Sequence, residues 1–362
     1  MRIEEAFSVI RNGASIKQFN GAGGIPITRI ETIAERFVDR EKMGYADIDS
    51  IGKYDSYVLQ DGDILMSHIN SVQHLGKTAI YHSLPNETII HGMNLLGLRA
   101  IKNVMNPEYA NYFFNSRAFL FQLPRITKKS VNQASFTVTE LKKLSIPCPT
   151  LEMQQHVVGV LKKIDGIIDG RKKQMLKLDE LVKSRFIEMF GDKNFDRLPW
   201  EDVFVAKTGK LDANAMVEDG KYPFFTCAKE IYRIDNYAFD QEALLLAGNN
   251  AVGKYDVKYY NGKFNAYQRT YVLSLKHKWS YELFKFQLED KLLSLQQQSL
   301  GGLTKYLTIK ILRGLDFIVP PIELQNEFAD FVNSTDKSKK ATQKSLDDLE
   351  TLKKSLMQQY FA

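Results

Sequence analysis

The chain has 362 residues, 44% of them hydrophobic and 25% charged, which is typical of a soluble globular protein of about two domains. Two cysteines exclude a disulfide framework, and with no apolar run of ~20 residues and no apolar signal-peptide core we expect a cytoplasmic protein without a membrane partner. The net charge of +6 permits a nucleic-acid partner without requiring one.

The first 150 residues mix short apolar runs with Gly and Asn turns, which predicts a domain of the α+β class. We expect strands in "DILMSHI" (63–69) and "TAIY" (78–81), where apolar and β-branched residues dominate. The stretch "EYANYFFNSRAFLFQL" (108–123) predicts a helix.

Residues 151–191 predict one long helix. Apolar residues recur at alternating spacings of four and three, which is the heptad pattern of a coiled coil, and Pro147 and Pro149 block helix formation upstream. The apolar seam consists of Val157, Leu161, Ile164, Ile168, Met175, Leu178, Val182 and Met189. A helix of ~40 residues is about 60 Å long, so an apolar stripe along it needs a partner of equal length.

The second half of the chain predicts the same succession. Residues 192–320 contain the strand-like runs "ALLLAG" (243–248) and "TYVLSL" (270–275), followed by the helix-like "SYELFKFQLEDKLLSL" (280–295). Residues 321–362 predict a second long helix with a weaker heptad seam. We expect the two long helices to form an antiparallel coiled coil, because that arrangement avoids crowding both globular domains at one end.

A direct repeat supports this division. "PTLEMQQHVVGVLKKID" (149–165) aligns without a gap with "PPIELQNEFADFVNSTD" (320–336), at an offset of 171 residues. "TVTELKKLSIPCP" (137–149) aligns with "TIKILRGLDFIVP" (308–320) at the same offset, which also matches Phe113 with Phe284. Upstream, "DGDILMSHINSVQHLGKTAIY" (61–81) resembles "DQEALLLAGNNAVGKYDVKYY" (240–260). The chain is therefore a tandem duplication of one unit, a globular domain followed by a helix.

Two diverged copies of one domain at a set spacing predict a two-part reader of a long, regular polyanion such as duplex DNA. Amide and imidazole side chains in the loops can donate and accept at base edges, and Lys and Arg can hold phosphates or read guanine. For any one such residue, the alternative is an ordinary solvated surface position. The candidate DNA-binding residues are Arg29, Asn70, Gln73, His74, Lys77, Asn94, Arg99, Lys128, Asn249, Asn250, Lys254, Lys258, Gln268, Arg269 and Lys305.

The order and spacing of these motifs resemble the specificity (S) subunit of Type I restriction–modification enzymes. The resemblance rests on "PTLEMQ" and "PPIELQ" at the two helix openings, on "MFGD" (189–192) and on "GDILMS" (62–67), and it covers essentially the full chain. It implies that each globular domain is a target-recognition domain that reads one half of a split, asymmetric sequence of double-stranded DNA. It also implies that the coiled coil sets the gap between the two half-sites.

The resemblance implies partners as well. Two methyltransferase (M) subunits would dock on the coiled coil and would carry S-adenosylmethionine, and motor-nuclease (R) subunits would join for cleavage, so this chain itself would bind no cofactor. The implied segments are target-recognition domain 1 (1–150), spacer helix 1 (151–191), target-recognition domain 2 (192–320) and spacer helix 2 (321–362). Docking predicts apolar helix residues beyond the mutual seam, although some of them would only thicken the coiled coil. These residues are Val158, Val160, Ile167, Leu181, Phe186, Ile187, Phe331, Leu352 and Phe361.

The alternative is a DNA-acting enzyme. "NPEY" (106–109) resembles the Asn-Pro-Pro-Tyr box of amino-methyltransferases, but its third residue is Glu108 and no glycine-rich cofactor loop precedes it. No His/Cys/Asp cluster has the spacing of a metal site. A generic coiled-coil adaptor would have no use for two diverged basic domains. We therefore predict a non-catalytic DNA-specificity subunit, with a methyltransferase-like enzyme that carries a degenerate NPEY site as the alternative.

Overall fold

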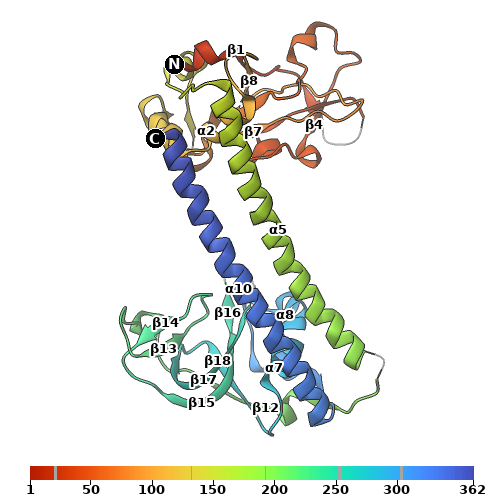
Figure 1. Ribbon diagram of the computed structural model, residues 1–362. Coiled ribbons are helices and arrows are strands. Elements are labelled where there is room, and N and C mark those ends of the chain that lie inside the picture. The colour runs from red at the N-terminus through yellow and green to blue at the C-terminus, as the bar shows by residue number, and fades with distance from the viewer. Residues whose placement is uncertain (20–22, 132, 192, 251–254, 302–304) are drawn as a thin grey trace. The chain divides into compact units, whose positions relative to one another are not determined.

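The computed structural model describes residues 1–19, 23–131, 133–191, 193–250, 255–301 and 305–362. It divides into two compact units: unit 1 comprises Met1–Lys172 with Lys344–Ala362, and unit 2 comprises Lys173–Gln343. Two 40-residue helices, α5 (Leu151–Phe190) and α10 (Ile322–Phe361), each contribute one segment to each unit (Figure 1). The two predicted long helices are thus confirmed, while the predicted domain boundaries at residues 150, 191 and 320 stay a prediction.

Unit 1 is built on a four-stranded antiparallel sheet in the order β1-β8-β5-β7, with two small sheets, β6-β10-β9 and β2-β4-β3. The central strand β5 (Ile64–Ser67) is buried at every position, which explains why its sequence is an apolar run without alternation. The other elements of unit 1 are α1 (Ile3–Ala6), β1 (Phe7–Asn12), β2 (Gln18–Phe19), β3 (Ile25–Ile27), β4 (Gly44–Ala46), β6 (Ile69–Asn70), β7 (Thr78–Ile80), β8 (Leu95–Ala100), α2 (Pro107–Phe114), α3 (Arg117–Gln122), β9 (Lys128–Lys129), β10 (Ala134–Ser135) and α4 (Val138–Lys143).

Unit 2 repeats this sheet and extends it. Its six-stranded sheet has the order β12-β18-β15-β17-β13-β14, and the first four strands correspond in order to β1-β8-β5-β7. The elements of unit 2 outside the long helices are β11 (Arg197–Pro199), α6 (Trp200–Val203), β12 (Phe204–Thr208), β13 (Tyr222–Phe225), β14 (Tyr232–Ile234), β15 (Phe239–Ala247), β16 (Asn249–Asn250), β17 (Val257–Ala266), β18 (Thr270–Leu275), α7 (Tyr281–Asp290), α8 (Leu292–Gln298), β19 (Lys305–Tyr306), α9 (Ile309–Leu312) and β20 (Asp316–Ile318). The shared strand order confirms the duplication that the sequence predicts.

The strands expected in each domain are present, but each expected domain helix is interrupted. The stretch 108–123 forms α2 and α3, and the stretch 280–295 covers α7 and most of α8. In unit 1 the break comes at Ser116, whose hydroxyl accepts a hydrogen bond from the Phe119 N–H (3.3 Å) and so caps a new helix. The periodicity of apolar residues continues through this cap, which is why the sequence pattern did not reveal the break.

Within each unit, the α5 and α10 segments run antiparallel. In unit 2, Asp179 pairs with Lys339 (2.8 Å) and Arg185 pairs with Glu327 (2.6 Å), so the partner number falls along α10 as the number rises along α5. In unit 1, Asp165 of α5 pairs with Lys353 of α10. The predicted α+β fold with an antiparallel helix pair is confirmed.

The predicted heptad seams are buried or half-buried in both helices. The α10 seam contains threonines, which would be costly to bury without hydrogen bonds. Thr335 donates its hydroxyl to the Phe331 carbonyl (2.9 Å), and Thr342 donates to the Ser338 carbonyl (2.9 Å), one turn earlier in each case. These bonds within the helix explain how a seam with a polar middle stays packed.

The repeated glutamine of the helix-opening motif is a buried structural residue. Gln154 is 0% exposed, and its side-chain carbonyl accepts a hydrogen bond from the Asn106 N–H (2.7 Å). Its amide donates to the carbonyls of Val104 (3.0 Å) and Pro149 (2.9 Å). One side chain thus ties the start of α5 to the start of α2, satisfying backbone groups that burial would otherwise leave unpaired.

Gln325 makes the corresponding bonds in unit 2. It is 1% exposed, accepts from the Ser280 N–H (3.0 Å) and donates to the Pro320 carbonyl (2.8 Å). The requirement for a buried amide that bridges a domain helix to a long helix explains why the same motif opens both long helices.

The capping residues of α2 and α7 set the correspondence between these helices. Asn106 caps α2 and Ser280 caps α7, which is an offset of 174 residues. At this offset the buried positions of the two helices coincide, and Phe284 corresponds to Ala110. The predicted match of Phe113 with Phe284 at offset 171 is therefore wrong, because the segment between the helix and the following repeat is three residues shorter in unit 2.

Candidate nucleic-acid interface

In unit 1, candidate residues meet on the small sheet that continues from the central strand. The strand β6 follows β5 after a single residue, and its Asn70 lies opposite Ala134 of β10. Ala134 in turn lies opposite Lys129 of β9, so Asn70 shares a three-stranded sheet with the exposed side chains of Lys128 and Lys129. The Asn70 side chain donates to the Ser67 hydroxyl (3.2 Å), and this bond orients its amide.

Unit 2 has a similar small sheet, but its lysine lies on the strand that pairs directly with the asparagine strand. Asn250 of β16 lies directly opposite Lys305 of β19. Ala134 and Lys305 are related by the offset of 171 residues, so the counterpart of Asn70 is Asn250. The ungapped alignment of 61–81 with 240–260 would place Asn249 at this position. The strand pairing moves the counterpart by one residue, because the connection from β5 to β7 is one residue longer than that from β15 to β17.

Asn94 and Arg269 form a second corresponding pair. β8 begins at Leu95, opposite the last residue of β5, and β18 begins at Thr270, opposite the last residue of β15. Asn94, with a φ of +74°, and Arg269 immediately precede these strands. Each unit therefore gathers three candidates around the end of its central strand, an amide on the short strand, a second polar residue and a lysine. These are Asn70, Asn94 and Lys128 in unit 1, and Asn250, Arg269 and Lys305 in unit 2.

The Arg99 guanidinium is engaged within the protein. It forms a two-pronged ion pair with Asp63, with Nε–Oδ1 at 2.8 Å and Nη2–Oδ2 at 2.7 Å. The hydrogen bond to this carboxylate raises the pKa of Arg99. Because Asp63 is buried, removing its partner would leave an uncompensated charge, which gives Arg99 a structural role. A contact of Arg99 with DNA stays a prediction.

Three other candidate cations also bond within the chain. Arg29 donates to the Gln18 side chain (2.7 Å), and Lys77 donates to a loop carbonyl (2.9 Å). Lys258 donates to another carbonyl (2.9 Å) and pairs with Asp256. These bonds hold the loops that flank the strand ends, so the same side chains can position neighbouring residues even without touching DNA.

Gln73, His74 and Gln268 lie on turns, where Gln73 and Gln268 are exposed and His74 is half-buried. Gln73 and His74 follow β6 on a 3-10 turn and contact each other at 3.3 Å. Gln268 lies on the turn before Arg269 and donates to Asp212 (3.3 Å). Lys254 lies outside the described residues.

His68 is a residue that the sequence reasoning missed. It occupies the break between β5 and β6, is 5% exposed, and its Nδ1 has no hydrogen-bond partner among the described residues. Burial lowers the pKa of His68, so the ring is neutral near pH 7 and keeps one nitrogen as an acceptor. The available signal was a histidine inside the apolar run "LMSHI".

The NPEY motif is a helix start. The Asn106 side chain accepts hydrogen bonds from the backbone N–H groups of Glu108 (2.9 Å) and Tyr109 (3.3 Å), and Pro107 takes the first helical position. Tyr109 is 1% exposed and belongs to the apolar core. These contacts account for the motif by helix capping and core packing, which removes the main sequence argument for a methyltransferase-like site.

Comparison with known families agrees with the duplicated architecture. A family model described as "Type I restriction modification DNA specificity domain" matches residues 1–178 and again residues 193–351. The chain belongs to this family. The predicted resemblance is thereby confirmed, and two copies of the specificity domain correspond to the two halves of the repeat.

Curated relatives carry the same description. The chain is 40% identical over 196 residues to the putative type I restriction enzyme MjaX specificity subunit of Methanocaldococcus jannaschii, a match that covers 54% of this chain and 45% of that protein. It is 57% identical over 72 residues to the type I restriction enzyme EcoDI specificity subunit of Escherichia coli, covering 20% of this chain and 16% of that protein. The matches thus span about half or less of these curated relatives.

A solved structure supports the fold. The S subunit of a Type I restriction–modification system from M. genitalium superposes with a TM-score of 0.64 over 100% of this chain and 95% of that one, at 13% sequence identity. At this identity the likeness shows the fold of the specificity-domain pair. Among the described residues, no helix has the length and apolar character to cross a membrane, and no cluster of three or more His, Cys, Asp or Glu could hold a metal ion.

Proposed function

We propose that this chain is the specificity subunit of a Type I restriction–modification enzyme, and that each globular domain reads one half of a bipartite DNA sequence. The observation that carries the proposal is the repeated edge at the end of the central strand. Both units place an asparagine-bearing short strand and a lysine-bearing strand in one small sheet, with Lys128–Lys129 one strand away from Asn70 in unit 1 and Lys305 directly opposite Asn250 in unit 2. A structural duplication alone would not require polar and basic residues at this edge in both copies.

The chemistry of this edge suits base reading. A short β-ribbon fits the major groove of B-DNA, where an asparagine amide can bond adenine at two positions and an arginine can bond guanine at two positions. Lysines beside them can neutralise phosphates, which adds affinity without sequence preference. The corresponding positions differ, Asn94 in unit 1 and Arg269 in unit 2. We therefore expect the two half-sites to differ, with a guanine contact favoured in the half read by unit 2.

The long helices supply the spacing and the docking surface. Each has 40 residues and is about 60 Å long, and would set the unspecified gap between half-sites. Val158 and Phe361, which were predicted to help in docking, are buried in the core of unit 1 instead. Other predicted apolar residues on the helices are 48–65% exposed and are available for partners, namely Ile167, Leu181, Ile187 and Leu352.

The remaining parts of the assembly follow from this role. Two methyltransferase subunits would dock on the helices and would supply S-adenosylmethionine and the methyl transfer, and motor-nuclease subunits would join them for cleavage in the cytoplasm. This chain would contribute recognition without catalysis. Residues 1–150 and 192–320 would be the target-recognition domains, and residues 151–191 and 321–362 the spacer helices.

The test is methylome sequencing of a host that carries this chain with its cognate methyltransferase. We expect methylation at one split motif with two dissimilar halves. Arg269→Gln should relax one half only, by about 1–3 kcal/mol of discrimination at one base. Lys221→Gln is the matched control, because it removes one positive charge at an exposed position of the same unit, and it should leave the motif unchanged. A single contiguous motif, or relaxation of both halves by Arg269→Gln, would contradict the proposal.

A further inference from the structure

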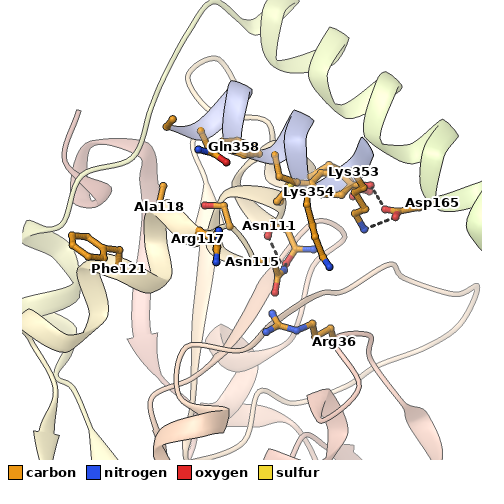
Figure 2. Close-up of a pocket in the computed structure, with 16 residues that line it drawn as sticks. Arg36, Asn111, Asn115, Arg117, Ala118, Phe121, Asp165, Lys353, Lys354 and Gln358 are labelled. Carbon is orange, nitrogen blue, oxygen red and sulfur yellow. Dashed lines mark hydrogen bonds and ion pairs between the residues drawn. The ribbon is translucent and has the colours of Figure 1, made fainter. Parts of the chain in front are cut away.

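Unit 1 contains a cleft of about 1070 Å³ where α2, the loop around Arg36 and the two long-helix segments meet (Figure 2). Four Lys or Arg side chains and two carboxylate side chains line it, for a net side-chain charge of +2. Both carboxylates are already neutralised within the protein, because Glu108 pairs with Lys162 (2.7 Å) and Asp165 pairs with Lys353. The cleft therefore has cations in excess.

Three of those cations have no carboxylate partner among the described residues. They are Arg36, Arg117 and Lys354. In Figure 2, Arg36 and Lys354 enter the cleft from opposite walls. Arg36 also has a φ of +63°, a backbone conformation that is unfavourable for arginine, and partial desolvation lowers the pKa of its guanidinium.

The cleft is apolar as well as basic. Phe121 is 74% exposed at its wall, and Met357 and Tyr112 contribute to the lining. A nucleic-acid backbone would bring no apolar group to these side chains. A protein segment that carries carboxylates beside an apolar side chain matches both features.

Unit 2 has a cleft of about 610 Å³ at the corresponding place, lined by α7 and the other two long-helix segments. Three lysines and five carboxylates line it, for a net charge of −2. By the correspondence of the helix caps, Glu289 and Asp290 stand where unit 1 has Asn115 and Ser116. The sign of the charge is thus reversed at structurally equivalent sites.

We propose that the cleft of unit 1 binds an acidic segment of a protein partner, and that the equivalent cleft of unit 2 binds the same segment more weakly. The proposal rests on the proposed function, in which two copies of one methyltransferase subunit dock on pseudo-symmetric sites. Two identical partners then meet one attracting cleft and one repelling cleft. They bind with unequal affinity, and salt narrows the difference because it screens both charges.

The experiment titrates the full chain with its cognate methyltransferase subunit and resolves the first and second binding steps by native mass spectrometry or calorimetry at 50 and 300 mM salt. We expect at least a tenfold difference in Kd beyond the statistical factor at low salt, and a smaller one at high salt. Equal affinities in the native chain at both salts overturn the proposal.

Two variants test the two clefts separately. Arg36→Asn with Arg117→Gln removes the unpaired cations, and asparagine tolerates the backbone at residue 36. This double variant should weaken the first step about tenfold. Lys53→Gln with Lys102→Gln makes the same charge change at exposed positions outside the cleft lining and should leave both steps unchanged. Equal effects of the two double variants overturn the proposal.

The second variant gains binding and so cannot be confused with misfolding. Glu289→Asn with Asp290→Ser transplants the unit 1 residues into the unit 2 cleft, and should strengthen the second step severalfold while leaving the first unchanged. No gain overturns the proposal. The proposal is also overturned if the Arg36 and Arg117 double variant binds all DNA duplexes more weakly but binds its partner as before, because the cleft would then bind nucleic acid. A native chain that binds no methyltransferase subunit overturns the proposed function along with this inference, which distinguishes the two failures.

Discussion

The two units join their domain helices to the long helices by different chemistry at corresponding positions. In unit 1, Tyr112 of α2 donates its hydroxyl to Asp165 (2.8 Å), and Lys353 pairs with the same carboxylate. In unit 2, the position of Tyr112 is taken by Phe286, which packs on Phe186 with a ring-centroid distance of 4.7 Å. The comparison teaches that the shared strand order and the buried glutamines define the architecture, while the junction tolerates either polar or aromatic packing.

The largest expected effect is in the aromatic junction of unit 2. Phe328 is 0% exposed, with ring centroids 5.5–5.7 Å from those of Phe186, Phe190 and Phe286. Phe328→Ala should lower the free energy of unfolding of unit 2 by about 3–5 kcal/mol, because it opens a cavity among these rings. Urea unfolding followed by tryptophan fluorescence measures this, since Trp200 and Trp279, the two tryptophans of the chain, both belong to unit 2.

Ile187→Ala is the matched control, because that side chain lies near the end of α5 in the same unit and is 65% exposed, and it should cost less than 1 kcal/mol. The loss for Phe328→Ala should not change between 50 and 300 mM salt, because apolar packing involves no charge. A strong salt dependence would mean that the junction of unit 2 is electrostatic, like that of unit 1.

A second, smaller effect distinguishes the two buried glutamines. Gln154→Ala leaves three backbone partners without their bonds and should cost about 3 kcal/mol in unit 1, whereas Gln325→Ala leaves two and should cost about 2 kcal/mol in unit 2. Hydrogen exchange of the backbone amides of α2 and α7 reports each unit separately. Gln155→Ala, an exposed neighbour on α5, should change neither. If Gln154→Ala behaves like this control, the hydrogen-bond network does not hold the helix start.

The third effect concerns acid. Burial lowers the pKa of His91 in unit 1 to about 4, below its unfolded value of 6.5, and also lowers the pKa of His68. The folded state therefore binds these protons less readily, and stability that is fully present above pH 6.5 is lost as pH falls toward 4. His91 accounts for up to about 3 kcal/mol of this loss.

Unit 2 should respond in the opposite direction. Burial raises the pKa of Glu289, so the folded unit gains a proton more readily than the unfolded chain and becomes slightly more stable as pH falls. Amide exchange, corrected for intrinsic rates, should show unit 1 opening between pH 6.5 and 4.5 while tryptophan fluorescence stays constant. His91→Gln should flatten the acid response of unit 1, whereas His277→Gln should leave it unchanged. If tryptophan fluorescence changed at a higher pH than amide exchange in unit 1, unit 2 would be the acid-sensitive unit and the prediction would be wrong.

The sequence predicted what depends on periodicity. The heptad spacing located both long helices, and the apolar runs located the central strands β5 and β15, because burial along a regular element leaves a repeating signal. The break at Ser116 was missed, since a cap is a local hydrogen bond inside an unbroken apolar pattern.

The candidate site was less accessible to sequence reasoning. Which cations are free for DNA depends on pairing between distant residues, as for Arg99 and Asp63, and no local pattern encodes that. The correspondence of Asn70 with Asn250 needed the strand register, because a change in loop length had shifted the alignment. The charged cleft of unit 1 is lined by segments from four separate parts of the chain. The opposite charges of the two clefts therefore became visible only in the folded structure.

The split composition of unit 1 has a consequence for its synthesis. Unit 2 is one continuous stretch, Lys173–Gln343, and can close its core as soon as that stretch leaves the ribosome. Unit 1 is translated first, but some of its contacts need residues that are made last. The Tyr109 ring packs on Phe361 with a centroid distance of 5.1 Å, and Asp165 pairs with Lys353, which is 188 residues later in the chain. The domain that emerges first is thus completed last, because part of its core comes from the last segment of α10.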